Sequence, residues 1–288
     1  MKTILPQRAA SQIVWIKVLT IVGVIACWEI VARSGLFFEG VIPPTHAVLL
    51  AIGQELMDGG FYRDLGVTLL EAVVGFACGS LIAITLGIFL GLKPFARKMI
   101  EPYITAIGGT PKIIFLPILF LLFGLGIESK MAKAALSTFF PVVLSTTSGF
   151  LQIPNILLRV GQSFHLTRWE MVTKIYVPAM AQALLTGLRL GMAMAIIGVL
   201  SAEITYSDRG LGFRLIRNAD MFQIPTVYAL AILIFALAAT INFALTKLEL
   251  HFAKHERRRE RPAAGNRTEG NVAPNAALSL KSLGKGHA

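Results

Sequence analysis

The side chains of this sequence that could do chemistry are concentrated between residues 152 and 178. This stretch, here named the docking segment, is polar and basic, whereas the chain on either side of it is apolar. Its apolar residues recur at spacings that predict two short amphipathic helices, with Trp169 as a large amphipathic anchor beside Arg168. Because Trp and Arg are enriched where proteins bind one another, we interpret it as a docking element for a protein partner. The alternative is that its helices lie on lipid headgroups.

The sequence lacks the motifs of catalysis and nucleotide binding. No Gly-x-x-x-x-Gly-Lys-Ser/Thr, His-Glu-x-x-His or Gly-x-Ser-x-Gly sequence occurs in the chain. Cys27 and Cys78 lie in apolar runs, and no second Cys or His stands near either of them at metal-ligand spacing. We therefore expect no enzymatic activity, no catalytic residue, no metal site and no cofactor.

A second group of candidate residues surrounds a break in an apolar segment. Pro111 removes a backbone donor, and Gly108 and Gly109 loosen the helix before it. In lipid, such a break persists where protein or a water-filled cavity satisfies the freed carbonyls. We interpret these residues, together with the adjacent Lys112, as lining a pathway through the membrane.

Two charged residues of a later apolar segment, Arg189 and Glu203, are also candidates. A charge inside a membrane span is a functional candidate by default. These two residues either line the same pathway or pair with neighbours to fix helix packing. We see no pair of acidic residues within the spans that would form a coupling-ion site.

The elements that carry these residues are apolar enough to cross a bilayer. The chain has 288 residues, of which 55% are hydrophobic and 15% charged, with a mean hydropathy of +0.69. A crossing helix needs about 20 apolar residues. The sequence therefore predicts an all-α membrane protein with six transmembrane helices, at about 18–32, 68–92, 102–123, 131–150, 179–204 and 226–248.

The segments between the spans carry weaker signals. We expect Glu29 to face a protein neighbour or the interface, since a carboxylate in lipid is costly. The run Thr45–Met57 predicts an amphipathic helix on the outer surface, with Thr45 as its N-cap. Residues 206–214 are interpreted as an outer loop that turns on its glycines. A weak match to a signal-peptide cleavage site at residues 32–34 offers the alternative that the first span is removed.

The distribution of basic residues predicts the topology. The formal charge is +11, but eight Lys and Arg against three Glu lie beyond residue 253, and most others lie in short loops. This pattern favours cytoplasmic loops over nucleic-acid binding. Residues 1–17, the loop 93–98, the docking segment and the cluster 254–261 then share the cytoplasmic side, with both termini there. We expect residues 253–288 to form a disordered basic tail.

Several stretches resemble the permease subunits of bacterial binding-protein-dependent ABC importers of the nitrate, sulfonate and taurine type. The family's cytoplasmic signature, Glu-Ala-Ala-x-x-x-Gly followed after nine residues by Ile-x-Leu-Pro, is similar to this chain at Ile175-Tyr176-Val177-Pro178. His165 stands at the position of the signature Gly, and residues 159–161 replace Glu-Ala-Ala. The resemblance covers residues 40–250, including Thr68-Leu69-Leu70-Glu71 through Gly75-Phe76, Pro111-Lys112, Gly187-Leu188-Arg189, Ala202-Glu203-Ile204 and Gly210-Leu211-Gly212.

The resemblance implies a type I ABC importer permease that works in the bacterial inner membrane. Its expected partners are a second permease subunit, in a homodimer, cytoplasmic ATPase subunits, a periplasmic solute-binding protein and membrane lipid. The replacement of Gly by His165 is expected to disturb the tight turn of the signature. The residues expected to couple to the ATPase are His165, Leu166, Thr167, Arg168, Trp169, Glu170, Ile175 and Pro178.

Two other classes of protein remain as alternatives. An ATP-independent secondary transporter or channel would work without an ATPase and would need paired acidic groups in its spans. A membrane scaffold would not need the breaks around Pro111.

Overall fold

The computed structural model describes residues 7–35 and 41–259. Within these ranges every regular element is helical, and no strand occurs. The elements are α1 (Gln7–Arg33), α2 (Thr45–Met57), α3 (Gly59–Leu92), α4 (Pro94–Gly109), η1 (Lys112–Phe115), α5 (Leu116–Phe123), α6 (Ile127–Leu151), α7 (Asn155–Ser163), α8 (Arg168–Glu170), η2 (Met171–Tyr176), α9 (Val177–Ala179), α10 (Ala181–Thr205), α11 (Leu211–Asp220) and α12 (Ile224–Arg259).

Five of these helices are long and apolar enough to cross a membrane: α1, α3, α6, α10 and α12. A sixth candidate is the pair formed by α4 and the helices after it, which bend by 95° at the break around Pro111. The predicted third span, residues 102–123, is therefore not one helix across the membrane. The helix ends at Gly109 because Pro111 cannot continue its hydrogen bonds, and the chain resumes in a new direction.

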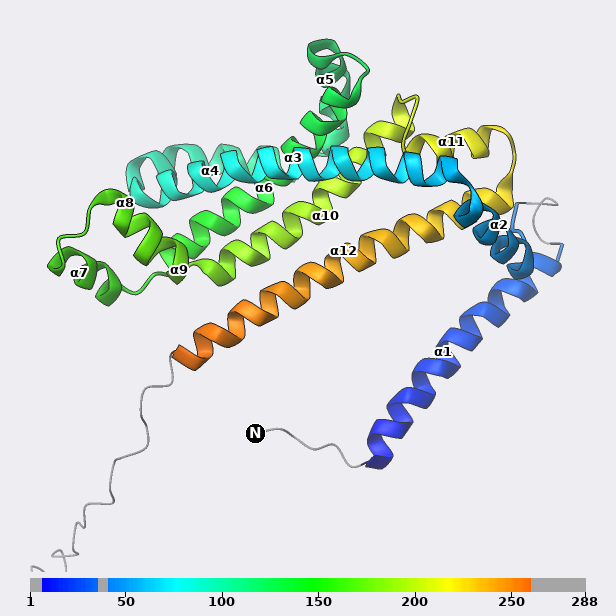
Figure 1. Ribbon diagram of the computed structural model, residues 1–288, viewed down its shortest axis with the longest axis horizontal. Coiled ribbons are helices and arrows are strands. Elements are labelled where there is room, and N and C mark those ends of the chain that lie inside the picture. The colour runs from blue at the N-terminus through cyan, green and yellow to red at the C-terminus, as the bar shows by residue number, and fades with distance from the viewer. Residues whose placement is uncertain (1–6, 36–40, 260–288) are drawn as a thin grey trace, which may run out of the picture.

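The centre of the molecule is a bundle of α3, α6 and α10 (Figure 1). Small residues allow these helices to approach closely, as expected where van der Waals contact rather than hydrophobic burial drives association in lipid. A methyl group at Gly79 of α3 would collide with the Ala135 backbone of α6. On the other side of α6, a methyl group at Gly187 of α10 would collide with Ser145.

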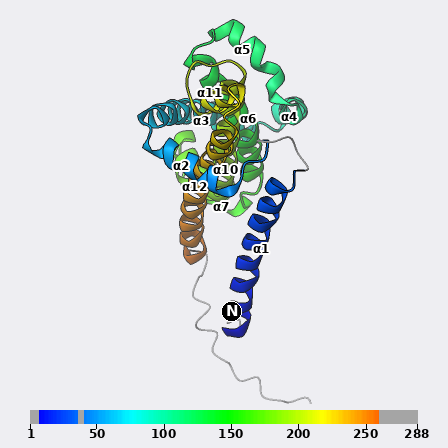
Figure 2. The same cartoon turned by 90° about the vertical axis from the view of Figure 1, so that its right-hand side faces the viewer.

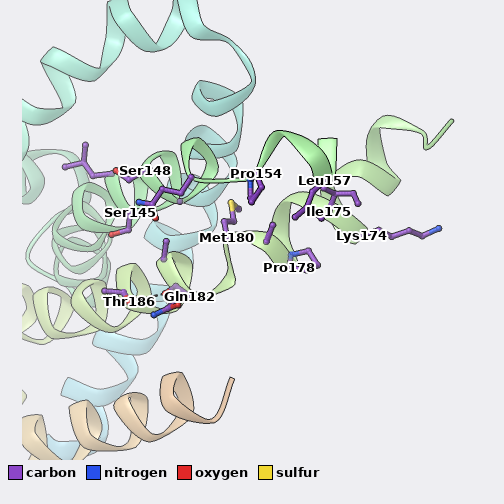
Figure 3. A pocket seen from close by; sticks show the side chains of 15 residues that line it. Ser145, Ser148, Pro154, Leu157, Lys174, Ile175, Pro178, Met180, Gln182 and Thr186 are labelled. Carbon is purple, nitrogen blue, oxygen red and sulfur yellow. Dashed lines mark hydrogen bonds between the residues drawn. The ribbon is translucent and has the colours of Figure 1, made fainter. Parts of the chain in front are cut away.

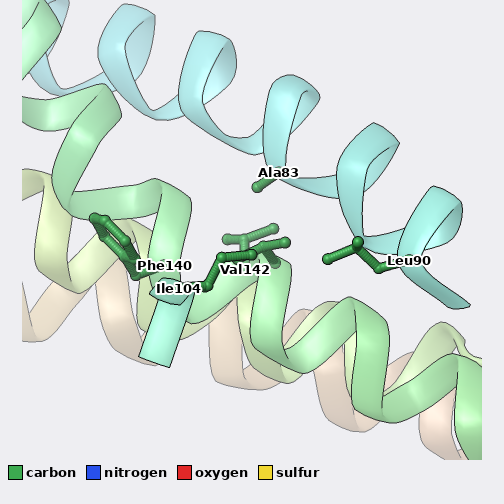
Figure 4. Close-up of a cluster of buried hydrophobic side chains, with 6 residues drawn as sticks. Ala83, Leu90, Ile104, Phe140 and Val142 are labelled. Carbon is green, nitrogen blue, oxygen red and sulfur yellow. The ribbon is translucent and has the colours of Figure 1, made fainter. Parts of the chain in front are cut away.

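One apolar cluster fixes α4 against this bundle (Figure 4). Ala83 and Leu90 of α3 meet Val142 and Phe140 of α6, and Ile104 of α4 packs among them. All of these side chains are at most 6% exposed. The position of α4, and so of the break that follows it, is therefore set by contact with α6.

A polar layer closes the end of the bundle at which α2, α11 and the start of α3 meet. The Arg214 guanidinium on α11 pairs with Glu55 (2.7 Å), with Asp64 (3.3 Å) and with Asp58. The interpretation of residues 206–214 as a loop is wrong from Leu211 onward, because α11 begins there. Only residues 206–210 connect it to α10.

The first helix stands apart from the bundle and approaches it only near α2 (Figures 1 and 2). The Glu29 carboxylate accepts hydrogen bonds from the Thr45 backbone N–H (3.0 Å) and hydroxyl (2.8 Å). The expectation that Glu29 faces a protein neighbour is thus confirmed. Thr45 is not the N-cap of α2, because Pro44 occupies that position and Glu29 supplies the acceptor instead.

The last helix is longer than predicted. It runs to Arg259, so residues 253–259 are helical rather than part of a disordered tail. The rest of the predicted tail, residues 260–288, and the first six residues of the predicted N-terminal segment lie outside the described residues.

Candidate functional site

The docking segment folds as two helical arms joined by a tight turn, with α7 as the first arm and the run α8, η2 and α9 as the second. The turn is a Schellman motif. The N–H of Leu166 donates to the Gly161 carbonyl (3.1 Å) and the N–H of His165 donates to the Gln162 carbonyl (3.0 Å). His165 has φ +49°, in the left-handed region. The expectation that losing Gly would disturb this turn is therefore wrong: the turn forms, and His165 bears its strain.

The second arm begins with a capping box. The Thr167 hydroxyl accepts a hydrogen bond from the Glu170 N–H (3.3 Å), and the Glu170 carboxylate accepts one from the Thr167 N–H (3.0 Å). Lys174, one turn later, donates to Glu170 at 2.7 Å. The hydrogen bond from Lys174, followed by those from Thr167, lowers the pKa of Glu170 to about 2. Thr167 and Glu170 therefore fix the start of this arm.

The second arm then widens into a π-helix, η2. Pro178 has no N–H to donate to the carbonyl four residues before it, and its ring would crowd that carbonyl, so a wider helical register relieves the contact. Gly161 of the first arm is buried against Met171, where a methyl group would collide with the thioether. The Tyr176 ring stacks at 4.8 Å from the Phe150 ring of α6. The arms are thereby packed on each other and tied to α6.

Large side chains remain exposed on this rigid segment. Trp169 is 74% exposed and Phe164 is 75% exposed, one on each side of the turn. Arg168 is also exposed. The amphipathic pattern of the docking segment did not single out Phe164. Its position directly before the turn residue His165, with Trp169 after the turn, could have indicated that both aromatic side chains are exposed.

A cavity of about 900 Å³ lies between the docking segment, α6 and α10 (Figure 3). Ile175 and Pro178 contribute to its wall from the docking segment, and Ser145 and Thr186 from the spans. The predicted coupling residues thus divide into three groups. His165, Leu166, Thr167 and Glu170 shape the turn, Arg168 and Trp169 point outward, and Ile175 and Pro178 line the cavity.

Further along α6, the predicted pathway residues Gly108 and Lys112 lie together at Phe140. The Lys112 ammonium donates to the Gly108 carbonyl (2.7 Å) and lies 5.2 Å from the centre of the Phe140 ring. Gly108 itself packs against Phe140, whereas Gly109 and Pro111 are exposed. The Lys112 ammonium satisfies a carbonyl freed by the break.

Arg189 and Glu203 do not belong to the same site. They are fourteen residues apart on α10, about 21 Å along the helix axis. Arg189 forms an ion pair with Glu249 of α12 (3.0 Å). The sequence left open whether Arg189 lines a pathway or fixes helix packing, and this ion pair favours helix packing.

Glu203 is fully buried and holds α11 in place. Its carboxylate accepts hydrogen bonds from the Thr68 hydroxyl (2.7 Å) and from the Gly212 N–H (2.7 Å). The Thr68 hydroxyl in turn accepts one from the Leu211 N–H (2.9 Å). A carboxylate at the N-terminus of α11 satisfies its free N–H groups and complements its dipole.

The statement that the spans hold no acidic pair is wrong. Glu71, one turn along α3 from Thr68 and also fully buried, adjoins the Glu203 carboxyl. Neither oxygen of Glu71 receives a hydrogen bond from any group in residues 7–35 and 41–259. Two adjoining buried carboxylates would repel each other, so the pair would be strained if both of its members carried a charge. The sequence missed the pair because 132 positions separate its members.

No group of three or more His, Cys, Asp or Glu with metal-binding geometry occurs in the described part of the chain. What the fold defines is a multi-pass helical membrane protein with a rigid, partly apolar segment projecting from one end of its bundle. A broken helix lies beside the same bundle.

The sequence places this protein within a known family of that class. Residues 83–254 match the family model of the binding-protein-dependent transport system inner membrane component, and the chain belongs to this family. It is a permease subunit of an ABC importer, in the bacterial inner membrane. The family assignment disfavours a secondary transporter or a scaffold, despite the acidic pair.

Individual relatives span most of the chain. A putative aliphatic sulfonates transport permease protein of Bacillus subtilis is 26% identical, with 81% of this chain and 85% of the relative covered. The taurine transport system permease protein of Escherichia coli is 28% identical over 80% of this chain and 85% of its own length. A formylaminopyrimidine transport permease protein of Halalkalibacterium halodurans is 30% identical, with 76% of this chain and 87% of the relative covered.

The fold is also found among solved structures. The methionine ABC transporter MetNI, in an inward-facing conformation, superposes with a TM-score of 0.61 at 16% sequence identity. The match covers 69% of this chain and 98% of that one. This similarity supports the type I importer fold.

Proposed function

We propose that this permease subunit forms a homodimer that moves a small solute with an anionic group, of the nitrate, sulfonate or taurine type, inward across the membrane. Two cytoplasmic ATPase subunits would dock on the docking segments and supply the energy. A periplasmic binding protein would deliver the solute at the other end of the bundle.

The observation that carries the proposal is the rigid presentation of Arg168 and Trp169. A segment that transmits motion must hold its shape under load, because interfaces switch as bodies rather than deform continuously. The Schellman turn and the capping box supply this rigidity on either side of the exposed residues. The chain contains no nucleotide-binding motif, so the ATP must be bound by the partner.

The same end of the bundle gathers the segments that the charge pattern assigns to the cytoplasm. Thr186, close to the start of α10, donates to Glu249 of α12 at 2.6 Å, so this part of α12 lies beside the start of α10, which follows the docking segment. The predicted basic loop 93–98 is Lys93 followed by the first turn of α4, and it comes directly after the end of α3, which packs against Phe150 near the end of α6. With Lys and Arg retained inside, both termini are assigned to the cytoplasm.

The apolar faces left open by one chain suit a second copy and lipid. On α5, Leu121 is 88% exposed, and on α1 both Leu19 (73%) and Trp15 (72%) are exposed. In Figure 1, α5 projects from the bundle on one side and α1 stands apart on the other. A homodimer would cover part of this surface, and lipid the remainder.

A binding assay with the purified ATPase tests the docking assignment. Trp169→Ala and Arg168→Glu should each weaken the affinity of the permease for the ATPase at least tenfold, which is about 1.4 kcal/mol. The matched controls are Trp15→Ala and Arg209→Glu, which change exposed residues of the same types far from the docking segment. Unchanged affinity in both docking variants, with ATP-driven uptake intact, would refute the assignment.

A further inference from the structure

A lysine without an acidic partner in the described residues is buried in the bundle, on the helix against which the broken segment with Lys112 packs. Lys133 on α6 is 3% exposed, and its ammonium makes no hydrogen bond or ion pair with any group in residues 7–35 and 41–259. Lys112, on the short helix η1 that packs on α6, brings a second positive charge to this region. Burying one uncompensated charge is costly, and a second charge of the same sign adds to the cost.

The neighbouring acidic pair does not neutralise these lysines. The cation that acts on Glu71 and Glu203 is Lys130, one turn before Lys133 on α6. Lys130 is itself buried, and its ammonium donates to the Leu125 carbonyl (3.3 Å). The cluster around Glu203 therefore has its own positive charge, and Lys133 is left unpaired.

The geometry around Lys133 brings three elements together. Lys133 and Phe140 lie on one face of α6, two turns or about 10 Å apart along the helix axis. The Lys112 ammonium lies 5.2 Å from the centre of the Phe140 ring, so both lysines lie along this face. The short helix η1, which carries Lys112, packs on both α6 and α10. Ser137, one turn after Lys133, is buried against Gly198 of α10 and offers a hydroxyl.

We propose that Lys112 and Lys133 form a transit site for the anionic group of the solute, at the junction of η1, α6 and α10. This inference rests on the transport function proposed above. An oxyanion passing this point would receive charge-assisted hydrogen bonds from the two ammonium groups and would compensate their burial. Lys112 is already held at the break, so only its contact with the Gly108 carbonyl must be exchanged.

The test measures anion binding by the permease–ATPase complex in lipid nanodiscs. Methanesulfonate, nitrate and sulfate are the probes, and dimethyl sulfone is the uncharged counterpart of methanesulfonate. At least one anion should raise the unfolding temperature of the wild-type complex in a concentration-dependent way, and dimethyl sulfone should not. Lys133→Met should weaken this response at least tenfold, whereas Lys133→Arg should keep it within about threefold, because it keeps the charge.

Two further variants separate the site from general effects of charge. Lys112→Met should weaken the response as well. Lys247→Met should leave it unchanged, because the Lys247 ammonium also lies over an aromatic ring, Phe243 at 4.5 Å, but on the exposed side of α12. Without anion, Lys133→Met should be at least as stable as the wild type, since it removes an unpaired buried charge. A purely structural lysine would instead lose stability.

The outcomes distinguish this inference from the proposed function. A wild-type complex that assembles and hydrolyses ATP but ignores all three anions, or a Lys133→Met complex that responds like the wild type, overturns the transit site alone. A phospholipid headgroup is the other possible source of an oxyanion, and native mass spectrometry detects bound lipid. If the wild type retains an anionic phospholipid that Lys133→Met loses, and no anion raises the unfolding temperature, the transit site is also overturned. Failure of the wild type to bind an ATPase would instead overturn the proposed function.

Discussion

The carboxylate of Glu203 on α10 accepts a hydrogen bond of 2.7 Å from the backbone N–H of Gly212, in the first turn of α11. Thr68 of α3 completes the junction, because its hydroxyl donates to Glu203 and accepts from the Leu211 N–H. Three elements distant in sequence are thus joined by one buried carboxylate. This junction sets where α11 and its Arg214 cluster sit above the bundle.

The Thr68 hydroxyl can be removed without changing the volume of the side chain. Thr68→Val should lower the free energy of unfolding by about 1–3 kcal/mol, because two buried partners lose a hydrogen bond. Thr85→Val on the same helix is the control, since the Thr85 hydroxyl only bonds back to the Leu81 carbonyl on an exposed face. Thermal unfolding in detergent measures both variants. Equal effects would show that the junction contributes nothing specific.

The two buried glutamates should respond differently to the same substitution. Glu203→Gln should lower the free energy of unfolding by about 1–3 kcal/mol, because a carboxyl group that accepts two buried hydrogen bonds is lost. Glu71→Gln should leave it unchanged or raise it, because a neutral amide removes the repulsion between the two adjoining carboxyl groups. Unfolding of both variants over a range of urea concentrations gives the comparison. The reverse order of effects would show that Glu71, and not Glu203, is the carboxyl group that stabilises the fold.

The turn of the docking segment stores strain at His165. A side chain in the left-handed region costs roughly 1–2 kcal/mol relative to Gly. His165→Gly should therefore slow limited proteolysis within residues 152–178, and His165→Val should accelerate it, because a β-branched residue tolerates positive φ poorly. His165→Asn, which tolerates this conformation, should resemble the wild type. Faster cleavage of the Gly variant would show that the ring of His165 makes stabilising contacts that outweigh the strain.

The capping box predicts the behaviour of the docking segment at different pH values. The pKa of Glu170 is lowered from 4.5 to about 2, so its contribution to stability is fully present above about pH 4.5 and is lost as the pH falls towards 2. ATPase binding should therefore not vary between pH 5 and 8 through this group. Proteolysis of the segment should accelerate below about pH 4.5 in the wild type.

The variant Glu170→Gln supplies the control for this titration. Gln can still accept at the N3 position of a capping box, but it cannot titrate. Its proteolysis rate should not change with pH in the window from 4.5 to 2. If the proteolysis rates of the wild type and of Glu170→Gln depend on pH in the same way, the acid transition belongs to another group.

The sequence by itself determined the class of the protein and the location of its main surface element. Apolar runs of about 20 residues predict spans because a bilayer leaves the backbone few alternatives to helix. Amphipathic spacing predicted two short helices within residues 152–178, and the break at Pro111 follows from the missing N–H of proline. These features are local, so neighbouring residues are enough to indicate them.

Only the tertiary structure decided which distant side chains meet. Glu71 and Glu203 adjoin because α3 and α10 cross near the end at which α11 begins, and no local pattern connects these positions. Lys133 was absent from the candidate residues, although a charge inside the predicted span 131–150 was a local signal. Its burial and its lack of a partner among the described residues depend on the packing of α6. His165 adopts the turn that its residue type disfavours, since the packing of Gly161 on Met171 and the hydrogen bonds of both arms hold the conformation. Interactions between helices, rather than local preference, decided these three features.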